Sequence, residues 1–221
     1  MQSTFHARHL GAARIAGYLR ECGGDLGRAN RLYVWNAKLA GALGVDLGHL
    51  EVALRNALDE RMTARHARLT RSGDWIDDPT GELGRDRMGV GRHAQPYRDL
   101  ASAKGRVTSN HKPLSHGQVI SETTFGLWHQ LVSRKWSTRL WPDLAAAFPH
   151  APNRTRETVA DPVEALRDLR NRMSHHHRIW PRALDQDRTA ILTVAGYIDP
   201  DLASWIAGQS DVDALLAQRP V

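Results

Sequence analysis

Apolar residues recur at intervals of three and four through most of this sequence, and no segment alternates apolar with polar residues. The first pattern places side chains on one face of an α-helix, whereas alternation is typical of a half-buried strand. The stretch between Leu26 and Leu69 shows the helical spacing most clearly. The sequence therefore predicts an all-α fold, and we expect residues 1–221 to form a single domain.

Turn and capping residues divide this pattern into segments. The pair Gly23-Gly24 is suited to a helix end, and Asp46 is a residue type that commonly precedes a helix. Residues 104–117 collect Gly, Pro, Ser, Asn and His, so about 70–118 is expected to be an irregular, long-loop region. The expected helices span 7–21, 25–43, 46–69, 85–103, 125–132, 136–148 (interrupted at Trp141-Pro142), 189–197, 201–207 and a segment after Ser210.

The run Asp161-Pro162-Val163-Glu164 predicts a helix start. An acid before the helix, Pro at its first position and Glu at the third each favour that position. The alternative is a kink inside a longer helix that begins near Asn153.

Composition limits the class of protein. Of the 30 basic residues 26 are Arg, and the formal net charge is +6. The excess of arginine can reflect an RNA partner, because Arg binds phosphate through two N–H groups. It can equally reflect codon use in a GC-rich genome, because the basic residues are scattered along the sequence and not clustered. The single cysteine, Cys22, excludes a disulfide framework. Without a long apolar run or signal peptide, we expect a cytoplasmic protein with no membrane partner.

Arg170 occupies an unusual place on the helix predicted before it. On a helical wheel it falls inside the apolar stripe of Val163, Leu166, Leu169 and Met173. An unpaired cation there would be costly, so either a carboxylate meets it or the stripe borders a cavity or an interface that binds an anion.

Three consecutive histidines, His175, His176 and His177, follow this stripe. They are consistent with a solvated helix end, with a metal site, or with general acid–base chemistry near neutral pH. No flanking set of ligands completes a metal site, so we predict no metal and no other cofactor. If the helix continues through them, His177 lies beside Arg170 and His175 points about 140° away.

The segment 169–179 resembles the Abi-like (abortive infection) branch of the HEPN superfamily. Arg170-Asn171-x3-His175 fits the R-x4–6-H motif of that superfamily, and the string from Leu169 to His176 is similar to the Leu-Arg-Asn-x-x-Ala-His-His of Abi-like proteins. Two further stretches, 50–58 and 122–128, resemble their N-terminal helix and their central Glu-x-x-Phe-Gly segment. The three matches occur in the family's order.

The resemblance implies a HEPN-like helical bundle with additional helices, which dimerises and acts as a metal-independent ribonuclease in phage defence or as a toxin. Arg170 and His175 carry over as catalytic residues, and Asn171 as their polar neighbour, with His176 and His177 as supporting candidates. RNA is the implied substrate, the active site is expected at the homodimer interface, and an antitoxin or a phage-derived trigger is a possible partner. The alternative is a catalytically weak RNA-binding or protein-interaction module.

Glu51 and Arg55 are four residues apart on one predicted helix. The spacing is that of a surface ion pair, which contributes about 0.3–0.5 kcal/mol. Their place in the first Abi-like stretch offers a second interpretation, in which they orient Arg170 or contact the substrate.

Overall fold

A computed structural model describes residues 7–220, which form helices joined by turns and loops, without a β-strand. The all-α prediction is confirmed. Within the same residues no helix is both long and apolar enough to cross a membrane.

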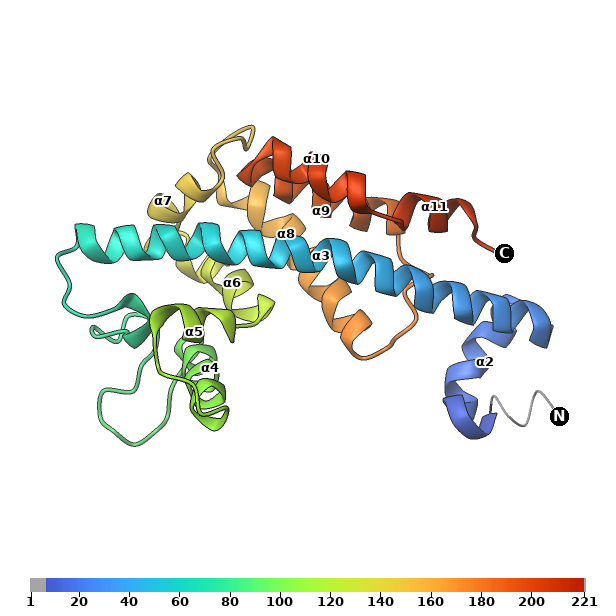
Figure 1. Cartoon of the computed structure of the whole chain (residues 1–221), viewed down its shortest axis with the longest axis horizontal. Helices are drawn as coiled ribbons and strands as arrows, with labels where there is room; N and C mark the ends of the chain where they lie inside the picture. Colours follow the sequence, from blue (N-terminus) through green and yellow to red (C-terminus); the bar gives the residue numbers. More distant parts are fainter. Residues whose placement is uncertain (1–6, 221) are drawn as a thin grey trace.

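The long helix α3, Leu26–Arg68, runs across the whole molecule (Figure 1). Its 43 residues give a rod of about 65 Å at 1.5 Å per residue. It begins at Asp25, whose carboxylate accepts a hydrogen bond from the Arg28 amide at 2.9 Å. One stripe of the helix is fully buried: Leu32, Leu39, Leu43, Leu50, Leu54 and Leu58.

The prediction of two helices, 25–43 and 46–69, is wrong. Asp46 is not a helix cap but lies buried in the middle of α3, where its carboxylate accepts a hydrogen bond from the Ser210 hydroxyl at 2.7 Å. The Arg188 guanidinium is 3.8 Å from the same carboxylate. A mid-helix Gly costs about 1 kcal/mol, whereas each buried leucine contributes about 1.5–3 kcal/mol, so the continuous stripe outweighs Gly44.

The other helices lie around this rod (Figure 1). At the N-terminal end of α3, α2 folds back against it and the short π-helical turn η1 packs on α2, while α9, α10 and α11 lie along one side and α4, α5 and α6 along the other. The bounds are η1 Ala7–Gly11, α2 Ala12–Glu21, η2 Trp75–Asp77, α4 Tyr97–Ser109, α5 His116–Ser121, α6 Phe125–Leu131, η3 Arg134–Trp136, α7 Trp141–Leu144, η4 Ala145–Ala147, α8 Arg156–Ser174, α9 Leu184–Ile198, α10 Pro200–Gln209 and α11 Val212–Ala217.

The middle of the chain corrects three predictions. The polar helix expected at 85–103 is α4, which begins only after Pro96, and its last turns occupy part of the loop expected at 104–117. Residues 85–95 are a loop because the carboxylates of Asp78 and Asp86 accept hydrogen bonds from its backbone N–H groups. The helix expected at 136–148 is replaced by short turns and by α7, which starts at Trp141 and carries Pro142 in its first turn.

Helix α8 decides between the two interpretations of Asp161-Pro162. It starts at Arg156 after Thr155 and continues to Ser174 with Pro162 inside it, so the longer helix is correct and a start at Asp161 is wrong. Pro162 is in the second turn of α8, where it removes one backbone N–H donor from the helix.

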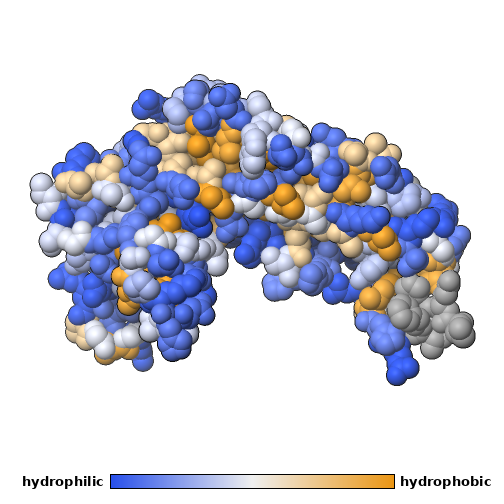
Figure 2. Space-filling view, viewed as in Figure 1, coloured by the Kyte–Doolittle hydropathy of each residue, from blue (hydrophilic) through white to orange (hydrophobic). Residues whose placement is uncertain are grey.

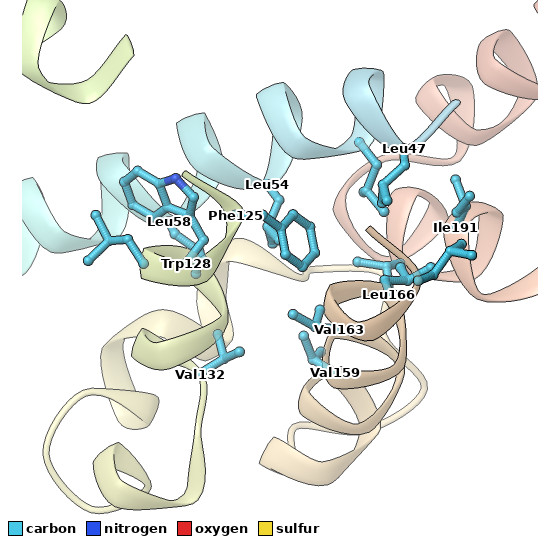
Figure 3. Packing of buried hydrophobic residues seen from close by; sticks show 14 of the residues in the cluster. Leu47, Leu54, Leu58, Phe125, Trp128, Val132, Val159, Val163, Leu166 and Ile191 are labelled. Carbon is cyan, nitrogen blue, oxygen red and sulfur yellow. The ribbon is translucent and has the colours of Figure 1, made fainter. Parts of the chain in front are cut away.

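The core forms where α3, α6, α8 and α9 meet (Figure 3). Trp128 and Phe125 of α6 lie between Leu58 and Leu54 of α3 and the valines of α8, and Leu166 faces Leu47 and Ile191. All the residues labelled in Figure 3 are buried. The direction of α8 is fixed by this contact, which carries its C-terminal end away from the core to below α3 (Figure 1).

The space-filling view shows an arch that is hollowed below α3, between the α4–α5 lobe and α2 (Figure 2). Helix α8 descends into this hollow, and the loop after it returns to α3 (Figure 1). The segment with the three histidines therefore lies in the hollow.

Candidate functional site

The three histidines form the turn that ends α8. His175 caps the helix, His176 has a φ of 52°, and the amides of His176 and His177 bond the carbonyls of Met173 at 2.9 Å and Arg172 at 2.8 Å. This pair of bonds is the Schellman motif, in which the left-handed position is usually Gly. A histidine there costs about 1–2 kcal/mol, so strain is stored within the motif that the sequence singled out.

The helical-wheel positions of the histidines, which assume that the helix continues, do not apply, because α8 ends at Ser174 and the chain reverses at His176. The rings of His175 and His177 come together instead, with their centroids 5.8 Å apart. All three histidines are exposed.

Asn36 of α3 holds the chain just after the histidines. Its side-chain oxygen accepts hydrogen bonds from the backbone N–H groups of Ile179 at 2.8 Å and Trp180 at 3.1 Å. Asn36 is 5% exposed, and Ile179 and Trp180 are also buried. Arg14 of α2 donates to the carbonyl of His176, so α2 holds the histidine turn itself and α3 holds the residues just after it.

A cavity of about 320 Å³ opens between α2, α3 and this turn. It includes His176 and His177, whereas His175 and Arg170 do not line it. Its wall contains basic and hydrogen-bonding side chains but no carboxylate. The lining residues are Arg14, Tyr18, Tyr33, Asn36, Ala37, Ala40, Gly41, Met173, His176 and His177.

The Tyr18 side chain of this cavity is buried and is influenced by two arginines. Burial, together with the neighbouring Tyr33, raises the pKa of Tyr18 to about 12, although the charges of Arg14 and Arg178 act in the opposite direction. The phenol is therefore neutral at physiological pH. Arg178 packs against Gly17 so closely that a Cβ at residue 17 would lie 1.9 Å from the guanidinium.

Arg170 is half-buried, and its guanidinium forms no ion pair or hydrogen bond with any residue in the range 7–220. The sequence leaves two environments open for Arg170: a carboxylate partner, or a cavity or interface that binds an anion. Within residues 7–220 no carboxylate pairs with it. Arg170 is one helical turn before Met173, which lines the cavity, but Arg170 itself is not a lining residue.

The remaining predicted residues lie outside the cavity. Asn171 is exposed, and its carbonyl accepts the His175 amide at 3.1 Å. Glu51 and Arg55 are half-buried on α3 and form no ion pair with each other; the Arg55 Nε donates instead to Asn56 at 3.4 Å. The surface ion pair expected from their spacing is therefore not formed.

Sequence reasoning missed four residues that the structure brings to the histidines: Arg14, Tyr18, Tyr33 and Asn36. Asn36 carries the one usable signal, because it is an amide at a position where the helical spacing requires an apolar residue. Arg14 and Tyr18 precede the histidines by more than 150 residues, and no local pattern links them.

No group of three His, Cys, Asp or Glu side chains that could hold a metal ion occurs in the described part of the chain. Comparison with protein-family models, with curated proteins and with solved structures gives no match. The resemblance to Abi-like proteins therefore depends on the three sequence motifs alone.

Proposed function

We propose that this protein is a metal-independent endoribonuclease of the HEPN type that acts in the cytoplasm in phage defence or as a toxin. One observation carries the proposal: the Arg-x4-His segment forms a strained, exposed turn that places histidine rings next to each other and leaves Arg170 without a partner. Unpaired charge and backbone strain together are typical of functional sites.

The side chains present suit RNA cleavage by the substrate's own 2′-hydroxyl. A neutral imidazole takes the proton of the 2′-OH, the oxygen attacks the adjacent phosphorus, and the P–O5′ bond breaks as a protonated imidazole donates to the leaving 5′-oxygen. The products are a 2′,3′-cyclic phosphate and a 5′-hydroxyl. The guanidinium of Arg170 stabilises the charge that develops on the phosphate oxygens.

The active form is proposed to be a homodimer. Within one chain Arg170 lies on the helical part of α8, whereas His175 caps its end and no shared contact joins them. Two-fold symmetry lets the same segment from each subunit meet at the axis, so that Arg170 of one chain faces His175 of the other. An antitoxin or a phage-derived trigger would act on this assembly.

The second candidate function is RNA binding or protein interaction without useful turnover. The observation that favours it is the separation of Arg170 from the histidine-lined cavity, because a chain that acts alone then lacks a guanidinium at the bound phosphate other than Arg14.

Cleavage of RNA by purified variants in excess EDTA tests the proposal. Wild type should cleave, and Arg170→Ala and His175→Ala should each lose at least about 100-fold, since a single acid–base group contributes about 10²–10⁴-fold and a donor that stabilises the developing charge about 10²–10³-fold. Arg170→Lys should also fail, because the bidentate contact is lost.

Arg154→Ala, an exposed arginine before α8, is the matched control and should keep full activity. Loss of cleavage in His177→Ala but not in His175→Ala would transfer the proton-carrying role to His177. Tight RNA binding without cleavage by wild type would instead support the second candidate function.

A further inference from the structure

The cavity beside the histidines contains two hydrogen-bonding groups without protein partners. The first belongs to Asn36. Its side-chain oxygen is committed to two backbone N–H groups, so the orientation of the amide is fixed and Nδ2 must point elsewhere. Nδ2 donates to no described residue, although the side chain is 95% buried, and it is not among the fully enclosed unpaired polar atoms. Asn36 therefore presents an N–H donor to the cavity that it lines.

Tyr18 supplies the second group. It is 2% exposed, and its ring is held edge-on to Tyr33 with the centroids 5.4 Å apart. The hydroxyl has no hydrogen-bond partner among residues 7–220, and it too is absent from the fully enclosed polar atoms. The Tyr18 hydroxyl therefore faces the cavity that Tyr18 lines and is free to bond a ligand there.

The charge of the wall selects an anion. Arg14, His176 and His177 line the cavity, with Arg14 donating to the His176 carbonyl, and none of the lining residues is acidic. A guanidinium beside uncompensated hydrogen-bond donors attracts a phosphate or another group rich in acceptor oxygens.

Size and the aromatic wall narrow the ligand further. A volume of about 320 Å³ is at the lower end of small-molecule pockets, which is enough for one nucleotide and too little for a folded or double-stranded nucleic acid. Tyr33 and Met173 provide an apolar wall against which a base can pack, and aromatic side chains accept any base in this way.

We propose that this cavity is a subsite for a single nucleotide, in which Asn36 and Tyr18 donate to the acceptor atoms of the base and Arg14 binds the adjoining phosphate. The inference rests on the proposed function for its choice of ligand, since RNA supplies such a unit next to the scissile bond. Arg14, Tyr18 and Asn36 then act in binding and positioning, not in proton transfer.

Calorimetric titration with 3′-uridine monophosphate tests the subsite. Wild type should bind this nucleotide at least about tenfold more tightly than uridine or inorganic phosphate. Tyr18→Phe removes only the hydroxyl, and Asn36→Asp keeps an oxygen for the two backbone N–H groups while replacing the donor with an acceptor. Each change should weaken binding of the nucleotide by at least about fivefold.

Tyr97→Phe is the matched control, because Tyr97 is also buried and belongs to α4, away from the cavity. It should bind the nucleotide as wild type does. Circular dichroism and thermal melting confirm that each variant is folded; if Asn36→Asp is not, Tyr18→Phe decides alone. Three outcomes would each overturn the subsite. In the first, wild type does not bind the nucleotide at all; in the second, it binds phosphate as tightly as the nucleotide; in the third, Tyr18→Phe binds the nucleotide as tightly as wild type does.

Cleavage assays on the same variants separate this inference from the proposed function. If wild type cleaves RNA and Tyr18→Phe raises KM without changing kcat, both stand. If wild type cleaves and Tyr18→Phe alters neither constant, the ribonuclease stands and the subsite is wrong. If nucleotide binding depends on Tyr18 but no RNA is cleaved, the subsite stands and the ribonuclease proposal fails.

Discussion

At the scale of single residues, the most informative feature is a non-glycine residue in a left-handed turn. His176 at the end of α8 and His111 after α4 have φ values of 52° and 54°, and both form the same pair of Schellman hydrogen bonds. The two histidines differ in surroundings, because His176 lines the candidate cavity and His111 does not. They therefore form a matched pair for separating strain from function.

We predict that His176→Gly and His111→Gly both raise the free energy of unfolding, by about 0.5–1 kcal/mol each. Relief of the left-handed penalty, about 1–2 kcal/mol, exceeds the greater flexibility that Gly gives the unfolded chain, about 0.4–1 kcal/mol. Urea denaturation measures the change. Activity or nucleotide binding should fall in His176→Gly alone. A loss of either in His111→Gly would contradict a role specific to the turn that lines the cavity.

At the scale of elements, His116 joins three separate segments. Its Nδ1 is 2.7 Å from the Asp74 carboxylate before η2, and its Nε2 is 2.9 Å from the Asp59 carboxylate of α3, while the ring itself starts α5. Burial lowers the pKa of His116, but the hydrogen bonds and charges of Asp59 and Asp74 together outweigh burial and raise the pKa above 6.5. Both ring nitrogens donate when the imidazole is protonated.

This arrangement predicts that the stabilising effect of His116 depends on pH. Because the folded-state pKa is raised, the contribution is complete below about pH 6.5 and is lost as the pH rises through the folded-state value. The difference in free energy of unfolding between wild type and His116→Ala should therefore shrink between pH 6 and pH 9. Urea denaturation at several pH values measures it, with the exposed His111→Ala as control; a difference that is constant with pH would contradict the protonated bridge.

The sequence predicts the elements well where local spacing decides and poorly where distant partners do. The buried stripes of α3, α6 and α8 follow from apolar spacing alone. The continuity of α3 through Asp46 does not, because Ser210 and Arg188, which accommodate the buried carboxylate, are more than 140 residues away. Within the site, the histidines and Arg170 are recognisable from the motif, whereas the end of α8 at Ser174 and the approach of α2 depend on packing.

At the scale of the whole molecule, the arch leaves the end of α8 accessible. The end of α8 descends into the hollow between α2 and the α4–α5 lobe (Figure 1), and all three histidines that follow it are exposed. A second subunit can therefore approach the segment that the proposed composite site requires.

The composite site predicts complementation between inactive subunits. Arg170→Ala and His175→Ala proteins should each be inactive, but mixing under conditions that allow subunit exchange puts roughly half of the dimers in the mixed form. Each mixed dimer regains one Arg170–His175 pair across the axis, so cleavage should reappear. Sedimentation and exchange of labelled subunits verify the mixing, and an exchanged mixture that stays inactive would place the pair within one chain.

The continuity of α3 fixes the distance and the angle between two contacts that lie far apart in the molecule. Asn36, which holds the histidine turn, and Asp59, which holds His116, are on the same uninterrupted helix, about 35 Å apart. Their spacing is set by a count of peptide units and not by the conformation of any loop. Insertion of one residue between them would rotate one end relative to the other by about 100° and advance it by about 1.5 Å. Related chains are therefore expected to vary in length in the loops and to keep this interval constant.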